Sequence, residues 1–207
     1  MRVRISRKLV SGTLRWTQPL FFAGAAVLLG YYGFVAADSW VFQQRESRNL
    51  QRLLETASAP SPDVVSRGLL GRLEIPRLGL SAILIEGDDA KTLRRAVGHV
   101  PGTALPGHSG NVALTGHRDT FFRPLRNIRE NDVIVVTTLQ GEYRYRVVST
   151  RIVAPDDVAV LNAGVGENLT LVTCYPFYFV GAAPDRFIVR AERVHAPAQS
   201  GPGGLNL

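Results

Sequence analysis

The chain has 207 residues, of which 45% are hydrophobic and 20% are charged, a composition typical of a folded globular protein rather than a disordered one. Five basic residues precede residue 16 and no acidic residue precedes Asp38, so the formal net charge of +7 resides mainly in the N-terminal tail. The rest of the chain is close to neutral, which argues against a nucleic-acid-binding face, and its single cysteine excludes an intramolecular disulfide.

The N-terminus carries the pattern of a membrane anchor. Residues 16–37 include no charged residue, and as a helix they would extend for about 33 Å, enough to cross the hydrocarbon core of a bilayer. Basic residues precede this segment and none follows it immediately, which predicts a cytoplasmic tail at 1–15 and an extracytoplasmic location for residues 38–207. A cleaved signal peptide ending at Val35-Ala36-Ala37 is the alternative, but the length of the apolar run favours a retained single-pass anchor in the cell membrane.

Residues 38–67 are predicted to connect the anchor to the folded domain. The first part, to Thr56, has apolar residues among Gln, Arg and Glu and indicates an amphipathic continuation of the anchor helix. A Pro/Ser cluster at 57–62 then ends the helix. We expect the folded domain at 68–195, followed by a Pro/Gly-rich, disordered tail at 196–207.

Short β-rich segments dominate the predicted domain, with brief helical turns between them. One short helix is expected over Ala90–Val97, and a Gly/Pro-rich loop over Gly98–Gly110. Many short strands with little helix predict an all-β barrel or sandwich. The predicted strands are Leu69–Ile75, Leu80–Glu86, Asn111–Thr115, Asp132–Leu139, Glu142–Val153, Leu169–Thr173 and Arg186–Val194.

Cys174 directly follows one of these strands, and Pro176 makes continuation of that strand unlikely because proline cannot donate to a ladder. A lone cysteine is commonly a small core residue. As a nucleophile it must be a thiolate, which a nearby base or cation favours. The neighbours of Cys174 in the sequence do not decide between these two interpretations.

Histidines and one arginine are the candidate partners of the thiol. His117 ends a strand-like segment after a glycine, and Arg186 begins the last predicted strand, twelve residues after Cys174. A solvated surface residue is the alternative interpretation for each of them. His99, His108 and His117 are nine residues apart, but this spacing matches no compact zinc pattern.

Three segments taken together resemble the signatures of the sortases, which are membrane-anchored cysteine transpeptidases. They are Thr-Gly-His-Arg-Asp-Thr at 115–120, Thr-Leu-Val-Thr-Cys at 170–174 and Ala-Pro-Asp-Arg-Phe-Ile-Val at 183–189. Their order is that of the family, the resemblance covers roughly residues 68–194, and the residues around Cys174 and His117 look most like class D. The resemblance implies a closed eight-stranded β-barrel, which agrees with the many predicted strands.

The resemblance also implies a mechanism and partners. Cys174 would be the nucleophile, His117 the general acid and base, Arg186 the group that stabilises the oxyanion and substrate, and Thr173 a substrate-binding residue. The substrates would be secreted proteins with a C-terminal LPxTG-like sorting signal, and the acceptor an amine of a cell-envelope peptide or a pilin lysine.

No cofactor is expected. Parts of the family are activated by calcium through acidic loop residues, but the acidic residues available here are better explained as helix caps and solvated turns: Asp88, Asp89, Asp119, Asp156 and Asp157. Two other functions stay open from the sequence. One is an extracytoplasmic cysteine peptidase that hydrolyses the same kind of acyl-enzyme, and the other is a non-catalytic, membrane-tethered β-domain.

Overall fold

The computed structural model describes residues 7–56, 68–179 and 181–194 of the chain. These residues divide into two compact units, Met1–Phe42 and Gln43–Leu207. The predicted tail at 196–207 and the Pro/Ser cluster at 57–62 lie outside the described residues.

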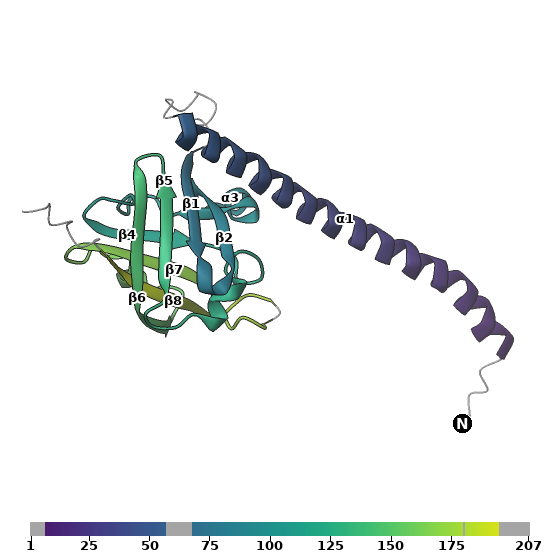
Figure 1. Ribbon diagram of the computed structural model, residues 1–207. Helices are drawn as coiled ribbons and strands as arrows, with labels where there is room; N and C mark the ends of the chain where they lie inside the picture. The colour runs from purple at the N-terminus through teal and green to yellow at the C-terminus, as the bar shows by residue number, and fades with distance from the viewer. Residues whose placement is uncertain (1–6, 57–67, 180, 195–207) are drawn as a thin grey trace, which may run out of the picture. The chain divides into compact units, whose positions relative to one another are not determined.

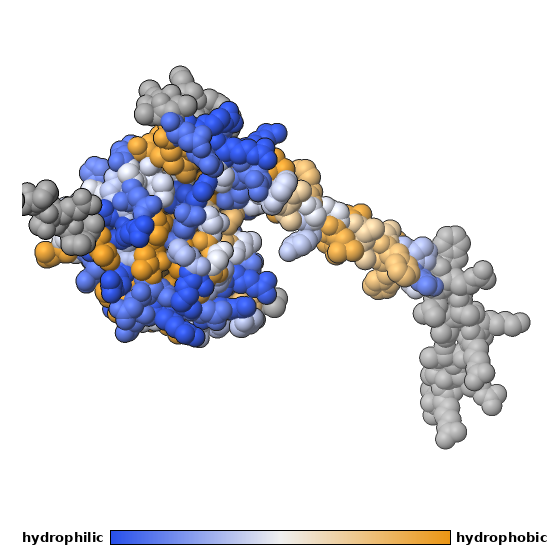
Figure 2. All heavy atoms as spheres, viewed as in Figure 1, coloured by the Kyte–Doolittle hydropathy of each residue, from blue (hydrophilic) through white to orange (hydrophobic). Residues whose placement is uncertain are grey.

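The first element is one long helix, α1 (Arg7–Thr56), which begins in the first unit and ends in the second. Its segment Thr17–Glu55 contains an 18-residue window of mean hydropathy 1.9, and the side chains of that window are not buried by the rest of the protein. Figure 2 shows apolar side chains on the surface of this helix. The helix is therefore long and apolar enough to be a membrane anchor, as the uncharged segment predicts.

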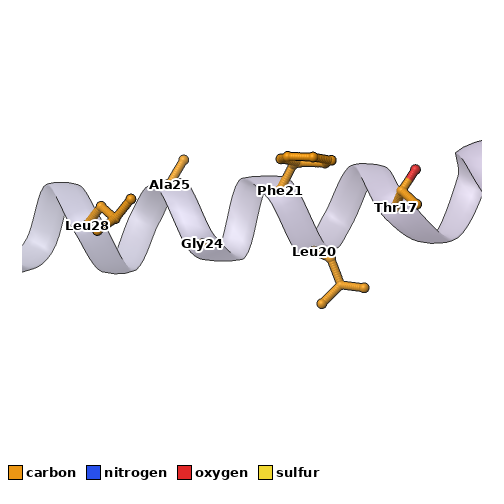
Figure 3. Close-up of a pocket in the computed structure, with 6 residues that line it drawn as sticks. All are labelled: Thr17, Leu20, Phe21, Gly24, Ala25 and Leu28. Atoms are coloured by element: carbon orange, nitrogen blue, oxygen red, sulfur yellow. The ribbon is translucent and has the colours of Figure 1, made fainter.

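A hollow along α1 belongs to this apolar surface. It has a volume of about 490 Å³ and is lined by Thr17, Leu20, Phe21, Gly24, Ala25 and Leu28. Figure 3 shows that all six residues come from the same stretch of helix. Because its lining residues all come from this one helix, we assign it no binding function.

The second unit is a closed barrel of eight strands, shown in Figure 1, with the order β1-β2-β3-β4-β7-β8-β6-β5. Two neighbouring pairs, β2 with β3 and β4 with β7, are parallel, and the others are antiparallel. The prediction of a closed eight-stranded barrel is confirmed. The strands are β1 (Leu69–Ile75), β2 (Leu80–Glu86), β3 (Val97–His99), β4 (Gly110–Thr115), β5 (Val133–Thr138), β6 (Gly141–Val153), β7 (Glu167–Tyr175) and β8 (Asp185–Arg193).

Short helices occupy the connections. They are η1 (Pro76–Leu78), α3 (Ala90–Arg95), η2 (Arg123–Asn127) and η3 (Val158–Leu161). Asp89 caps α3, because its carboxylate accepts hydrogen bonds from the backbone amides of Lys91 (2.8 Å) and Thr92 (3.2 Å). The hydroxyl of Thr92 also donates to the carboxylate of Asp89 (2.7 Å). This hydrogen bond is the largest cause of the lowered pKa of Asp89, and the two bonds from backbone amides lower it further.

Strand β3 differs from the prediction, which placed residue 97 in a helix and residues 98–110 in a loop. The helix ends at Arg95, and Val97–His99 pairs with both β2 and β4. A three-residue strand is too short to show an alternating pattern, and its partners lie elsewhere in the chain. This pairing adds the eighth strand that closes the barrel.

The barrel interior is filled by aliphatic side chains with a few aromatic rings. Leu73, Leu114, Phe122 and Tyr145 are fully buried in one continuous core. Strand β3 contributes only Val97 to this core, and each of the other strands contributes at least two residues. Each fully buried aliphatic or aromatic side chain contributes roughly 1.5–3 kcal/mol through loss of contact with water. A core of this size explains how the domain folds without a disulfide.

The last turns of α1 pack within the barrel unit. The amide side chain of Gln43 accepts a hydrogen bond from the backbone nitrogen of Ile83 (2.9 Å) and donates one to the carbonyl oxygen of Arg95 (2.6 Å). Leu50, on the same helix, is only 1% exposed. The predicted connecting segment is thus helical to Thr56, and its part after Phe42 belongs to the compact unit of the barrel.

Candidate functional site

Three neighbouring strands, β4, β7 and β8, bring the predicted site residues to one rim of the barrel. Cys174 in β7 lies directly opposite Arg186 in β8. On the other side of β7, Thr115 of the parallel strand β4 lies opposite Val172. Strand β4 ends at Thr115, and His117 follows two residues later, in the turn beyond this end of the strand.

The alternation of side chains along the strands places Cys174 and Arg186 on the same face. In β7, Leu171 and Thr173 are buried, whereas Val172 and Cys174 are half-buried. Successive residues of a strand point to opposite faces, and paired residues of neighbouring strands share a face. Cys174 and Arg186 therefore project outward from the barrel.

Cys174 is a free, half-buried cysteine, not a core residue. Aromatic rings pack around this end of β7 and β8: Phe177 lies edge-on to Phe187 with ring centroids 5.3 Å apart, and Tyr175 stacks on Phe187 at 6.3 Å. These rings form a small aromatic cluster next to the thiol. The strand also ends at Tyr175, as predicted from Pro176.

Arg186 is oriented by its own backbone neighbourhood. Its Nη1 donates to the carbonyl oxygens of Asp185 (3.0 Å) and Ala183 (3.4 Å). The side chain is half-buried and forms no ion pair among the described residues. Its remaining donors are therefore available to a ligand beside Cys174.

His117 lies in a turn that is fixed to β7 by hydrogen bonds on both sides of the preceding glycine. The nitrogen of Gly116 donates to the carbonyl oxygen of Val172 (3.3 Å), and the hydroxyl of Thr173 donates to the carbonyl oxygen of Gly116 (2.7 Å). A Cβ atom at Gly116 would lie only 3.0 Å from the ring of Phe122, so glycine permits this close packing. The ring of His117 itself is half-buried and forms no hydrogen bond among the described residues.

Thr173, the predicted substrate-binding residue, is only 2% exposed. Its hydroxyl is engaged with Gly116 on the inner side of the strand. The structure therefore places it beneath the site, where it joins the cysteine strand to the histidine turn.

Two arginines that the sequence analysis did not select hold the loop between β7 and β8. Arg118 donates to the carbonyl oxygens of Phe179 (2.9 Å) and Gly181 (3.0 Å), and Arg126 donates to the hydroxyl of Tyr178 (2.7 Å). Arg118 stands beside His117 within the signature segment, which was the only available signal in the sequence. Their targets, two backbone carbonyls and a hydroxyl about 60 residues away in the chain, could not be inferred from it.

The other described histidines do not join the site. His99 is buried, and its ring nitrogens contact Glu86 (Nδ1 to Oε2, 2.8 Å) and the carbonyl oxygen of Ala104 (Nε2, 2.9 Å). His108 is exposed, and His195 lies outside the described residues. Within the described part of the chain, no three His, Cys, Asp or Glu residues are grouped in a way that could hold a metal ion.

This end of the barrel therefore carries a thiol and a guanidinium on paired strands, with an imidazole in the turn that follows the neighbouring strand β4. A thiol beside an imidazole is the arrangement that covalent acyl transfer uses, and a fixed cationic donor beside both suits the charge that develops on a carbonyl oxygen.

Comparison with known proteins gives consistent results. A family model described as the sortase domain matches residues 73–194. Sortase D of Bacillus subtilis is 39% identical over 125 residues, which make up 60% of this chain and 63% of that protein. The chain thus spans less than two thirds of the length of this relative.

Solved structures with the same barrel include a Clostridium perfringens Sortase D5 transpeptidase. It superposes with a TM-score of 0.60 at 25% identity, covering 72% of this chain and 98% of that one. Sortase C-1 from Actinomyces oris superposes with a TM-score of 0.57 at 32% identity, covering 62% of this chain and 75% of that one.

Proposed function

The chain belongs to the sortase family, and we propose that it is a membrane-anchored cysteine transpeptidase that cleaves an LPxTG-like sorting signal and transfers the acyl part to an amine. The observation that carries the proposal is the register of β4, β7 and β8. It pairs Cys174 with Arg186, and it pairs the end of β4, which His117 follows, with the neighbouring residue Val172 of β7.

In the first half of the reaction, the sulfur of Cys174 attacks the carbonyl carbon of the Thr–Gly or Thr–Ala bond. The negative charge on the carbonyl oxygen is stabilised by N–H donors of Arg186. Protonated His117 gives its proton to the leaving amine as the C–N bond breaks. The product is a thioester between Cys174 and the threonine carbonyl, and the cleaved C-terminal peptide leaves.

In the second half, an amine of the acceptor attacks the thioester. His117 takes the proton from this amine, Arg186 again stabilises the oxyanion, and the C–S bond breaks to regenerate Cys174. An amide joins the substrate to the acceptor. Thr173 supports this arrangement by holding the turn of His117 against β7 through the carbonyl of Gly116. The reaction as proposed uses no cofactor.

The proposed substrates are secreted proteins with a C-terminal LPxTG-like signal, and the proposed acceptor is a cell-envelope peptide or a pilin lysine. Helix α1 would hold the enzyme in the membrane with its N-terminus in the cytoplasm and its barrel outside. Both partners would then meet the site on the side of the membrane where the envelope is assembled.

Product analysis tests the proposal against the two alternatives. The full-length protein in detergent is incubated with an LPETG-containing peptide, with and without triglycine, and the products are identified by mass spectrometry. A triglycine-joined product that requires Cys174 supports transpeptidation. Cleavage without joining at saturating amine indicates a peptidase.

The non-catalytic alternative has a separate readout. Since Cys174 is the only thiol of the chain, a methanethiosulfonate reagent reports on it alone. A folded protein whose thiol resists this reagent, and which leaves the peptide intact, would be a binding domain.

A further inference from the structure

Arg118 follows His117 directly in the chain and reaches across to the loop between β7 and β8. Its Nη2 donates to the carbonyl oxygens of Phe179 (2.9 Å) and Gly181 (3.0 Å), and its guanidinium lies 5.9 Å from the centroid of the Phe179 ring. Its Nη1 is enclosed and has no hydrogen-bond partner among the described residues. Arg118 thus holds two backbone carbonyls of the loop at the protein surface, with one nitrogen of its guanidinium enclosed.

The base from which Arg118 extends is rigid. The carbonyl oxygen of His117 accepts hydrogen bonds from the nitrogens of Phe122 (3.0 Å) and Thr120 (3.4 Å), and Thr173 and Val172 hold Gly116 on the other side. Arg118 therefore fixes the loop relative to the same turn that carries His117.

The loop in turn orients Arg186. Gly181, which accepts from Arg118, is two residues before Ala183, and the carbonyls of Ala183 and Asp185 accept from Nη1 of Arg186. Asp185 is the first residue of β8 and Ala183 lies in the loop, so a displacement of the loop near Gly181 would move one of the two carbonyls that orient the guanidinium of Arg186.

We propose that Arg118 is a positioning residue for the transpeptidation reaction: it holds the β7–β8 loop against the turn of His117 and thereby keeps Arg186 aligned opposite Cys174. This proposal rests on the proposed function. Arg118 acts through the loop and through Arg186, and it is not assigned a contact with the substrate.

Arg126 provides a comparison on the same loop. Its Nη1 donates to the hydroxyl of Tyr178 (2.7 Å), and its guanidinium lies 5.5 Å from the centroid of that ring. Tyr178 is 76% exposed, so this contact is made at the outer part of the loop and to a side chain, not to its backbone. We therefore expect Arg126 to matter less than Arg118.

The test compares Arg118→Gln, Arg118→Lys and Arg126→Gln in the full-length protein in detergent. The matched control is Arg123→Gln, which removes an exposed arginine of the same segment that has no side-chain contact with the loop among the described residues. Turnover of a quenched LPETG peptide is expressed per Cys174 thiol titrated with a methanethiosulfonate reagent, which corrects for oxidised protein, and circular dichroism checks that each variant is folded. Hydrogen exchange of the loop amides is measured on the same samples.

We expect Arg118→Gln to lower kcat by about 10²-fold with KM changed less than about threefold, because misplacement of a catalytic group by about 1 Å costs this much. Arg118→Lys should recover part of kcat, since an ammonium group can reach the carbonyls but does not reproduce the planar guanidinium. Amides of the β7–β8 loop should exchange faster in Arg118→Gln than in Arg123→Gln.

An Arg118→Gln protein with kcat within twofold of Arg123→Gln per titrated thiol would overturn the proposal. So would loop exchange equal in the two variants. If the wild-type protein itself shows no turnover that depends on Cys174, the proposed function fails, and the role of Arg118 in the reaction fails with it. Wild-type turnover with an unaffected Arg118→Gln variant contradicts the positioning role alone.

Discussion

His99 and His117 both stand at the ends of strands, yet their surroundings are opposite. His99 is 2% exposed and has partners at both ring nitrogens: Glu86 on one side, and the carbonyl of Ala104 with the hydroxyl of Thr103 (3.0 Å) on the other. The half-buried ring of His117 has no hydrogen-bond partner among the described residues, although its backbone is fixed. An imidazole with both nitrogens engaged stabilises a fold, whereas one held in place with free nitrogens is available to carry a proton.

The largest loss of activity is expected for His117→Ala, which removes the histidine whose ring nitrogens form no hydrogen bond within the described part of the chain. Loss of a general acid and base is expected to lower kcat by about 10²–10⁴-fold. The free energy of unfolding should change little, because no hydrogen bond of the ring is lost. The variant is assayed with the quenched peptide and by urea unfolding; unimpaired turnover would remove His117 from the mechanism.

The second largest effect is expected for Arg186→Lys in β8, which tests whether the geometry of the guanidinium matters. The charge is kept, but an ammonium group cannot hold a carbonyl oxygen with the planar fork of a guanidinium. We expect kcat to fall by about 10²-fold, the cost of one lost oxyanion donor. Arg190→Lys serves as the control, because Arg190 lies four residues further along β8, on the same face of the strand. Near-normal turnover by Arg186→Lys would mean that Arg186 supplies only charge.

His99→Gln should show the converse behaviour. The amide cannot satisfy both the Glu86 side and the Ala104–Thr103 side, and an unsatisfied buried group costs about 1–3 kcal/mol of unfolding free energy. Turnover per titrated thiol should stay within about twofold of wild type, since free-energy changes at sites without shared partners are independent. A loss of turnover comparable with that of His117→Ala would show that the two histidines are functionally coupled.

The smallest effect, a change in the unfolding free energy, is expected for Asp132→Asn. Like His99, Asp132 has hydrogen-bond partners on both sides of its polar group. Its carboxylate accepts hydrogen bonds from Nε and Nη2 of Arg77 and from the nitrogen of Arg129 (2.8 Å), and the bond from Arg77 is the main reason that the pKa of Asp132 is lowered. Because Arg77 is 41% exposed, solvent screening limits the loss in Asp132→Asn to about 1 kcal/mol.

This loss should depend on pH. A carboxyl group whose pKa is lower in the folded state than in the unfolded state stabilises the fold above its unfolded pKa of about 4, and this stabilisation disappears as the pH falls through the folded pKa. The difference in unfolding free energy between wild type and Asp132→Asn should therefore be constant near neutral pH and shrink in acid. A difference that grows in acid would contradict the assignment.

The sequence was sufficient for most of the strands. Apolar and β-branched runs with Pro or Gly at one end mark β4, β7 and β8 with errors of one or two residues, and the order of the three sequence motifs selects Cys174, His117 and Arg186 as site candidates. Strand β3 was missed because its three residues owe their conformation to β2 and β4, not to their own pattern.

Hydrogen bonds between residues far apart in the chain could not be predicted from the sequence either. Nothing near Thr173 in the sequence indicates that its hydroxyl bonds to Gly116, and nothing near Arg118 indicates the carbonyls of Phe179 and Gly181. These bonds depend on the parallel register of β4 and β7 and on the path of a loop, which are properties of the folded barrel.

The central claim is that Cys174 forms an acyl-enzyme, and intact-protein mass spectrometry tests it most directly. The full-length protein is mixed with the LPETG peptide without an amine acceptor, quenched in acid and compared with Cys174→Ala. We predict a mass increase equal to the peptide up to its threonine, on the wild-type protein only, that hydroxylamine removes. The same increase on Cys174→Ala, or none on a wild-type protein that still cleaves the peptide, would contradict the account.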